Sequence, residues 1–192
     1  MSDTNFLSIL TGSFSTPCAD NPTVAMIEAA YRHHKIDARY INCDVKPANL
    51  ADAVHGARAM EWAGFNCSLP HKVEVISYLD KLSEAAQIIG AVNCVTIRDG
   101  QLTGDNTDGK GFLASLKSVT EPQGKKVLLM GAGGAARALA VELGLAGTAH
   151  ITVINREPEK AETIAALIRE KTGSDALTRP WKGMAQVSED ID

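Results

Sequence analysis

The sequence predicts an α/β protein in which a domain with a parallel sheet precedes a second, incomplete α/β domain. Stretches with the apolar pattern of short strands alternate with stretches of helical periodicity along most of the 192 residues. Strands separated by helices are typical of parallel sheets joined by right-handed crossovers. A glycine-rich segment, GAGGAA at 131–136, follows one such strand and opens a helix, which marks the second domain.

The first domain, residues 1–117, is predicted to begin with a strand at 7–10 and a turn from Gly12 to Pro22. The helix 23–34 follows, because apolar side chains recur there at helical spacing. Asp99-Gly100 predicts a hairpin, since this dipeptide suits the positive φ angles of a tight turn. The remaining predicted strands span 38–43, 65–69 and 92–97, and the remaining helices span 47–60, 73–78 and 83–89.

The second domain, residues 118–192, begins with a polar segment, SVTEPQGKK at 118–126, that has the composition of a linker. The most regular pattern in the chain comes next. It consists of a strand at 127–130, the glycine turn, a helix at 135–145, a strand at 151–154 and a helix at 159–171.

Composition and charge exclude several classes of protein. Hydrophobic residues make up 45% and charged residues 22%, which excludes a disordered chain. The net charge is −4 and the sequence contains no Lys/Arg cluster, so it lacks the basic patch typical of nucleic-acid-binding proteins. No apolar run approaches the ~20 residues that span a bilayer, and the first ten residues, MSDTNFLSIL, lack the features of a signal peptide. We therefore expect a cytoplasmic protein with no nucleic-acid or membrane partner.

The cysteines and histidines predict neither a metal site nor a disulfide framework. The four cysteines stand far apart with no C-x-x-C pair, and the five histidines lack the spacing of metal ligands. We expect reduced thiols and no metal.

The glycine turn fits the G-x-G-x-x-A pattern of dinucleotide-binding domains. In that pattern the first glycine permits the tight turn, the second admits a pyrophosphate close to the backbone, and the helix N-terminus supplies positive potential. The alternative is a strand–helix turn that needs glycine for backbone reasons only. The predicted cofactor contacts in the turn are Gly131, Ala132, Gly133, Gly134 and Ala135.

The end of the next strand bears on the choice of dinucleotide. An acidic residue there would bind the ribose 2′-hydroxyl of NAD, but Asn155 and Arg156 stand in its place, with Lys160 one helical turn beyond. Cations suit a 2′-phosphate and favour NADP. Glu157 opposes this unless its carboxylate points away, so NAD stays open.

Three motifs of the first domain carry more polar residues than turns require. They are GFNCSLPHK at 64–72, GAVN at 90–93 and GDNTDG at 104–109. Each residue has an ordinary explanation, such as a solvated lysine for Lys72 and a helix N-cap for Asp108. Because loops at the carboxyl ends of parallel strands converge on one crevice, together they predict a small polyol or acid site facing a nicotinamide.

These motifs, with VLLMGAGGAARA at 127–138, resemble the shikimate/quinate dehydrogenase family in order and spacing. The resemblance implies a substrate-binding domain followed by a Rossmann domain, and reversible hydride transfer between NADP or NAD and a ring carbon of shikimate or quinate. It also implies that Lys72 handles the proton of the reacting hydroxyl, that Asp108 orients it, and that Ser68 and Asn93 bind the substrate. Asn66 is implied to support the site.

The sequence departs from the family pattern in two places. The S-x-S-P motif that binds the substrate carboxylate falls on Asn21, Pro22, Thr23 and Val24, of which Asn21 and Thr23 can still hydrogen-bond a carboxylate. Family chains also continue beyond this length, so two Rossmann strands are expected, with an apolar surface left exposed. A non-catalytic small-molecule or nucleotide-binding remnant is the alternative function, and a homo-oligomer is left open.

Overall fold

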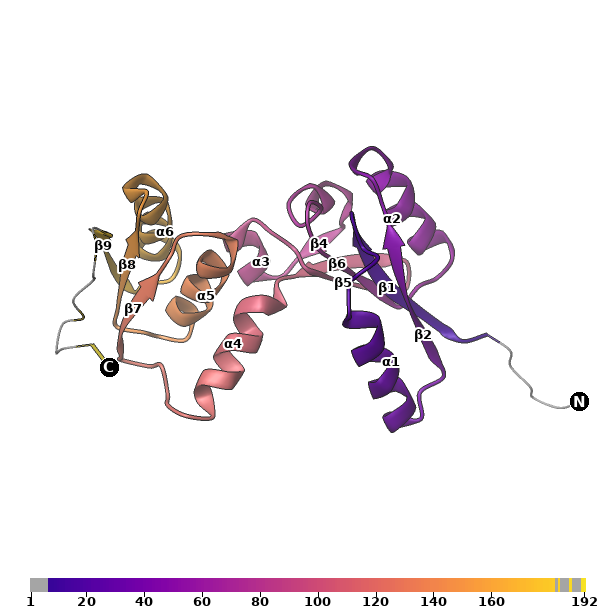
Figure 1. The fold of residues 1–192 in the computed structure, drawn as a ribbon, viewed down its shortest axis with the longest axis horizontal. Coiled ribbons are helices and arrows are strands. Elements are labelled where there is room, and N and C mark those ends of the chain that lie inside the picture. Colours follow the sequence, from indigo (N-terminus) through magenta and orange to yellow (C-terminus); the bar gives the residue numbers. More distant parts are fainter. Residues whose placement is uncertain (1–6, 182, 184–186, 188–190) are drawn as a thin grey trace, which may run out of the picture. The chain divides into compact units, whose positions relative to one another are not determined.

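The computed structural model describes residues 7–181, 183, 187, 191 and 192 (Figure 1). Residues 1–6, which are part of the stretch compared with a signal peptide, and residues 188–190 near the end of the sequence lie outside this part. The chain forms two compact units. Unit 1 takes in the chain up to Asp105 apart from Gln87–Ile89, and unit 2 takes Gln87–Ile89 and the chain from Asn106 onward. This division falls earlier than the domain boundary that the sequence predicts after residue 117.

Unit 1 is built on a six-stranded sheet of order β2-β1-β3-β5-β6-β4. β1 pairs in parallel with both β2 and β3, while β5 pairs antiparallel with β3 and β6. Its elements are β1 (Ile9–Ser15), α1 (Thr23–His34), β2 (Ala38–Asp44), η1 (Pro47–Asn49), α2 (Leu50–Ala59), β3 (Gly64–Cys67), η2 (Glu74–Tyr78), β4 (Lys81–Leu82), α3 (Glu84–Ile89), β5 (Cys94–Arg98) and β6 (Gln101–Asp105).

The α/β class and the parallel pairing of the first strands are confirmed. The predicted hairpin is confirmed as well, with Arg98 opposite Gln101 and positive φ angles of 52° at Asp99 and 72° at Gly100. The predicted turn from Gly12 is wrong at its start. Gly12–Ser15 continue β1 because they pair with β2 on one side, and most of them with β3 on the other.

The two faces of this sheet differ in chemistry, because successive side chains of a strand point to opposite faces. Phe14 of β1 lies in an apolar core with Leu50 and Val54 of α2, and its ring stacks on Phe65 at 4.4 Å between centroids. Thr11 and Ser13 point to the other face, where the Thr11 hydroxyl meets the Tyr31 hydroxyl of α1 at 2.8 Å. This polar face of the sheet carries the candidate substrate residues.

Unit 2 contains a three-stranded parallel sheet of order β7-β8-β9. Its elements are α4 (Thr107–Lys117), β7 (Lys126–Met130), α5 (Gly134–Leu145), β8 (His150–Asn155), α6 (Pro158–Lys171) and β9 (Asp175–Pro180). The expectation of two strands is wrong, since β9 pairs with β8 along its whole length. The sequence of β9, DALTRP, has no apolar run, so only its pairing with β8 reveals it.

The core of unit 2 fills the space between the sheet and its helices. Ile151 and Val153 of β8 are fully buried against Ile164 and Ile168 of α6. Among the residues that the structure describes, no helix is both long enough and apolar enough to cross a membrane.

Candidate active site

A hydrogen-bonded network lies at the carboxyl ends of β1 and β2. The Ser13 hydroxyl, 1% exposed, donates to Oδ1 of Asn42 at 2.9 Å and accepts from Nδ2 of Asn21 at 3.3 Å. Oδ1 of Asn21 accepts from the backbone N–H of Thr23 at 3.0 Å. Oδ1 of Asn21 and one N–H of its amide are therefore engaged, while the amide nitrogen carries a second N–H. The carboxylate-binding role of Asn21 stays a prediction.

A second network runs from β2 across β3 to Asn93. The Tyr40 hydroxyl donates to Oδ1 of Asn66 at 2.9 Å, and Nδ2 of Asn66 donates to the Asn93 carbonyl at 3.1 Å. The same carbonyl accepts from the Cys67 N–H at 2.9 Å, and the Asn93 N–H donates to Asp105 at 3.1 Å. The backbone of Asn93 is thus held from both sides, which fits the supporting role predicted for Asn66.

Sequence analysis did not single out Ser13, Tyr40 or Asn42. The pattern of β2 could have identified the residues on this strand. Polar side chains occur at every second position, Tyr40, Asn42 and Asp44, and therefore share one face of the sheet. Burial raises the pKa of the Tyr40 hydroxyl to about 12, so this group is a neutral hydrogen-bond donor at ordinary pH.

Lys72 follows β3 in a turn whose backbone is fixed at several points. The His71 side chain is 1% exposed, and its Nε2 lies 2.7 Å from the carbonyl of Val45. The carbonyl of Lys72 accepts from the Val92 N–H at 2.7 Å. Burial raises the pKa of the Cys67 thiol to about 12, and the nearby Lys72 charge acts in the opposite direction. Lys72 therefore lies by the end of β3 with Ser68, which is exposed.

Asp108 lies in the first turn of α4 and is exposed. The N-cap is Asn106, whose Oδ1 accepts from the Asp108 N–H at 3.2 Å. The ordinary explanation of Asp108 as the N-cap is therefore wrong. Lys72 belongs to unit 1 and Asp108 to unit 2, and their pairing stays a prediction.

The glycine turn connects β7 to α5 as the sequence predicts. Gly131 has a φ of 105°, and its N–H donates to the Ile154 carbonyl of β8 at 2.8 Å. Gly133 is the N-cap of α5 and provides no side chain to bind the first N–H groups of the helix, and the first turn contains no acidic residue. Those N–H groups are oriented as an anion-binding helix N-terminus requires.

Packing within the chain does not explain the glycines at 133 and 134. A Cβ added at either residue meets no heavy atom within 4 Å among the described residues, and neither residue has a φ in the left-handed region. The backbone alternative accounts for Gly131, and at Gly133 glycine is also a favourable N-cap residue. Close approach of a ligand to the backbone is a further physical reason for glycine at these two exposed positions.

The residues predicted to meet the ribose are held together at the end of β8. Nδ2 of Asn155 donates to the Glu157 carbonyl at 3.0 Å, and the Glu157 carboxylate pairs with Nζ of Lys160 at 2.8 Å. Arg156 is exposed between them. β9 adds Arg179, opposite Ile154 in register and so near the same edge of the sheet. Arg179 was not among the predicted site residues because β9 itself was not predicted.

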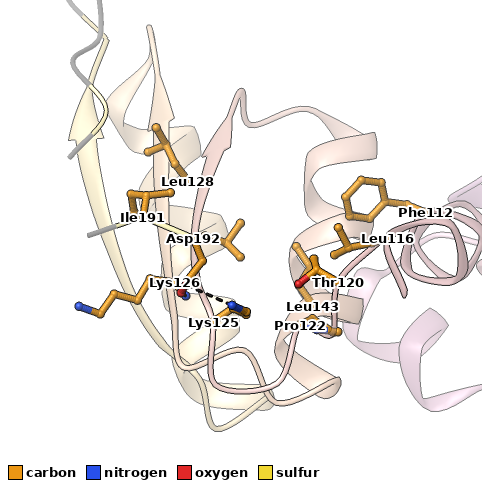
Figure 2. Close-up of a pocket in the computed structure, with 11 residues that line it drawn as sticks. Phe112, Leu116, Thr120, Pro122, Lys125, Lys126, Leu128, Leu143, Ile191 and Asp192 are labelled. Atoms are coloured by element: carbon orange, nitrogen blue, oxygen red, sulfur yellow. Dashed lines mark hydrogen bonds and ion pairs between the residues drawn. The ribbon is translucent and has the colours of Figure 1, made fainter. Parts of the chain in front are cut away.

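An apolar cavity of about 280 Å³ lies at the other end of β7, and no predicted site residue lines it. In Figure 2, Phe112 and Leu116 of α4 lie on one side and Leu128 and Ile191 on the other. In unit 2, Met130 is 54% and Leu177 is 55% exposed, and the exposed apolar surface expected there stays a prediction. Within the described part of the chain, no group of three or more His, Cys, Asp or Glu side chains is arranged to hold a metal ion.

Comparison with known families agrees with this geometry. The model of the shikimate dehydrogenase substrate binding domain matches residues 14–95, and the model of shikimate / quinate 5-dehydrogenase matches residues 114–185. The chain belongs to the shikimate dehydrogenase family. The first family model falls on unit 1 apart from Gln87–Ile89, and the second lies within unit 2.

Relatives within and around the shikimate dehydrogenase family show how far the likeness extends. The NADP(+) shikimate dehydrogenase of Desulforamulus reducens is 44% identical over 172 residues, which cover 88% of this chain and 59% of the relative. The chain therefore spans about three-fifths of that relative.

Two solved structures are also similar to this member of the shikimate dehydrogenase family. A ligand-free 5-ketofructose reductase of Gluconobacter sp. strain CHM43 is 66% identical with a TM-score of 0.96, over 98% of this chain and 68% of that one. The shikimate 5-dehydrogenase of Listeria monocytogenes, in complex with shikimate and NAD, is 36% identical with a TM-score of 0.88, over 94% and 64%.

Proposed function

We propose that this protein is an oxidoreductase that reversibly transfers a hydride between NADP(H) and a carbon bearing a hydroxyl group in a small polyhydroxylated substrate. The observation that carries the proposal is the glycine turn before α5, where Gly133 and Gly134 leave space that no other described residue occupies. The Desulforamulus relative, named for NADP(+), supports the choice of cofactor.

The residues of unit 2 fit a bound dinucleotide. Gly131, Ala132, Gly133, Gly134 and Ala135 provide the backbone next to the pyrophosphate, and Asn155, Arg156 and Lys160 lie by the ribose. Bare N–H groups at the start of α5 are suited to a phosphate. When bound, the nicotinamide supplies or accepts the hydride.

The proton of the reaction is assigned to Lys72. When the substrate is oxidised, its hydroxyl proton passes to the neutral amine of Lys72; in the reverse direction, the ammonium returns the proton to the carbonyl oxygen. Asp108 orients Lys72 and accepts a hydrogen bond from a neighbouring substrate hydroxyl. Ser68 and Asn93 bind further hydroxyls, and the fixed backbone of Asn93 supports this role.

Shikimate is the first candidate substrate, supported by the names of the Desulforamulus and Listeria relatives. Quinate and related cyclic acids remain in the same class. A second candidate, 5-ketofructose, is favoured by the 66% identity to the Gluconobacter reductase.

Gly133→Ala tests the cofactor site. A Cβ at this position meets no heavy atom of the described residues within 4 Å, so the loss of stability should be limited to the poorer N-cap that alanine provides, while affinity for NADP falls by about tenfold or more through contact with the ligand. Gly111→Ala in α4 is the matched control, because its Cβ also meets nothing and it lies outside the turn. Unchanged NADP affinity in Gly133→Ala, measured by calorimetry, would contradict the proposed site.

Turnover tests the reaction. The chain is mixed with NADP+ and shikimate or quinate, or with NADPH and 5-ketofructose, and the absorbance of the reduced cofactor is followed. Lys72→Ala should lower kcat by about 10²–10⁴-fold and leave cofactor affinity unchanged. The ratio of kcat/KM values ranks the substrates. Binding without turnover by the unmodified chain would favour the alternative of a non-catalytic remnant.

A further inference from the structure

We propose that Glu157 sets the preference between NADP and NAD by neutralising Lys160, one of the cations available to a 2′-phosphate. This inference rests on the proposed function, because it concerns the ribose end of the same cofactor site. It assigns the specificity role of Glu157 to its contact with Lys160, which the sequence does not show.

The first step is the contact between the two side chains. Oε1 of Glu157 lies 2.8 Å from Nζ of Lys160, and both side chains are more than half exposed. Lys160 therefore has its charge compensated while remaining close to the surface. An exposed ion pair of this kind is weak, so a ligand phosphate can compete for the lysine.

The second step is the fixed position of Glu157. Nδ2 of Asn155 donates to the Glu157 carbonyl at 3.0 Å, which ties this residue to the end of β8. In dinucleotide-binding domains this strand end is where a residue meets the ribose, an acid selecting the 2′-hydroxyl and an arginine the 2′-phosphate. The chain places both kinds of charge there, Arg156 and then Glu157.

The neighbouring charges leave Glu157 as the residue to vary. Glu159 also lies in the first turn of α6. Glu162 is engaged by Arg169 at 2.6 Å, and hydrogen bonds from Arg169 hold the pKa of the Glu162 carboxyl below its usual range. Glu157 is the acid that pairs with Lys160. Its carboxylate therefore lowers phosphate affinity by occupying Lys160.

Glu157→Gln is the test, with Glu159→Gln as a control that removes the same charge two residues further on. The probes are adenosine 2′,5′-bisphosphate and adenosine 5′-monophosphate, which differ only in the 2′-phosphate, and binding is measured by calorimetry. Glu157→Gln should tighten binding of the bisphosphate by about three- to tenfold and leave the monophosphate unchanged. The gain should shrink as salt is added, because exposed charges are screened.

A double variant assigns the effect to the pair. If Glu157 weakens phosphate binding by pairing with Lys160, the gain in bisphosphate affinity from Glu157→Gln should largely disappear in a Lys160→Gln background. A gain that persists there, or an equal gain in Glu159→Gln, overturns the inference. An unmodified chain that binds both probes while Glu157→Gln changes neither also overturns it, with the proposed function intact. Failure of the unmodified chain to bind NADP, NAD or either probe overturns both.

Discussion

The contact between α4 and α5 predicts a large difference between two alanine substitutions in one helix. Gly109 is buried, and a Cβ there would lie 2.5 Å from the Ala138 carbonyl oxygen and 2.7 Å from Cγ of Glu142. Gly111 stands two residues further along α4, where a Cβ meets nothing within 4 Å of the described chain. Both substitutions gain the same helix propensity, so their difference isolates the steric effect.

The magnitudes follow from general values. Replacing glycine by alanine in a helix gains about 0.8–1.0 kcal/mol, which Gly111→Ala should show as increased stability. Gly109→Ala adds the cost of overpacking, about 1–3 kcal/mol, and the upper part of this range applies because the nearest atom is backbone. We therefore expect Gly109→Ala to be less stable than Gly111→Ala by about 2–3 kcal/mol.

Urea denaturation followed by circular dichroism measures this difference. For a chain of this size each kcal/mol shifts the melting temperature by about 2–4 °C, so thermal melts provide a second measurement. Equal stability of the two variants would refute the packing that the structure assigns to α4 and α5. The result also concerns function, because Gly109 adjoins Asp108, and a displaced α4 would move the predicted catalytic carboxylate.

Two further predictions concern unit 1. Burial raises the pKa of Tyr40 from 10.0 to about 12, so between these pH values the unfolded chain loses its proton first and stability falls as pH rises, by up to about 1.4 kcal/mol per pH unit. Tyr40→Phe should flatten this decline in urea denaturation, and an unchanged slope would show that another group causes it. His71→Leu leaves the Val45 carbonyl without its 2.7 Å partner and should cost about 1–3 kcal/mol. His71→Gln, which retains a donor, should recover part of that loss in the same assay, and equal losses in both variants would contradict the role of the bond.

Substrate choice is the point at which the relatives diverge. The relatives named for shikimate and the one named for 5-ketofructose align with the same chain. The Ser13–Asn21–Asn42 network lies at the carboxyl ends of the strands where the substrate is predicted to bind. A comparison of kcat/KM for a carboxylate substrate and a neutral keto sugar therefore tests what this network binds. A preference for the neutral sugar would indicate that the network takes the place of the S-x-S-P hydroxyls, which bind the substrate carboxylate in the family pattern.

Local patterns in the sequence were sufficient for the α/β class, the hairpin at Asp99-Gly100 and the strand–turn–helix around Gly131. These features depend on neighbouring residues, through helical periodicity, the φ angles that Asp-Gly tolerates and the glycine spacing of one turn. The motifs around Lys72, Asn93 and Asp108 were visible for the same reason, because each lies within a few consecutive residues.

Other features depend on partners that are distant in the sequence. β9 has no apolar run and exists through its pairing with β8, and the polar stretch from Gly12 belongs to a strand because it pairs with β2 and β3. The open space that a Cβ would find at Gly133 and Gly134 among the described residues, and the ion pair of Glu157 with Lys160, are likewise properties of atoms in space. The sequence by itself determined the class of fold and the chemistry of its motifs. The tertiary structure decided which side chains are already engaged and which surfaces are left open to a ligand, since hydrogen bonds and steric contacts form only once the strands are paired.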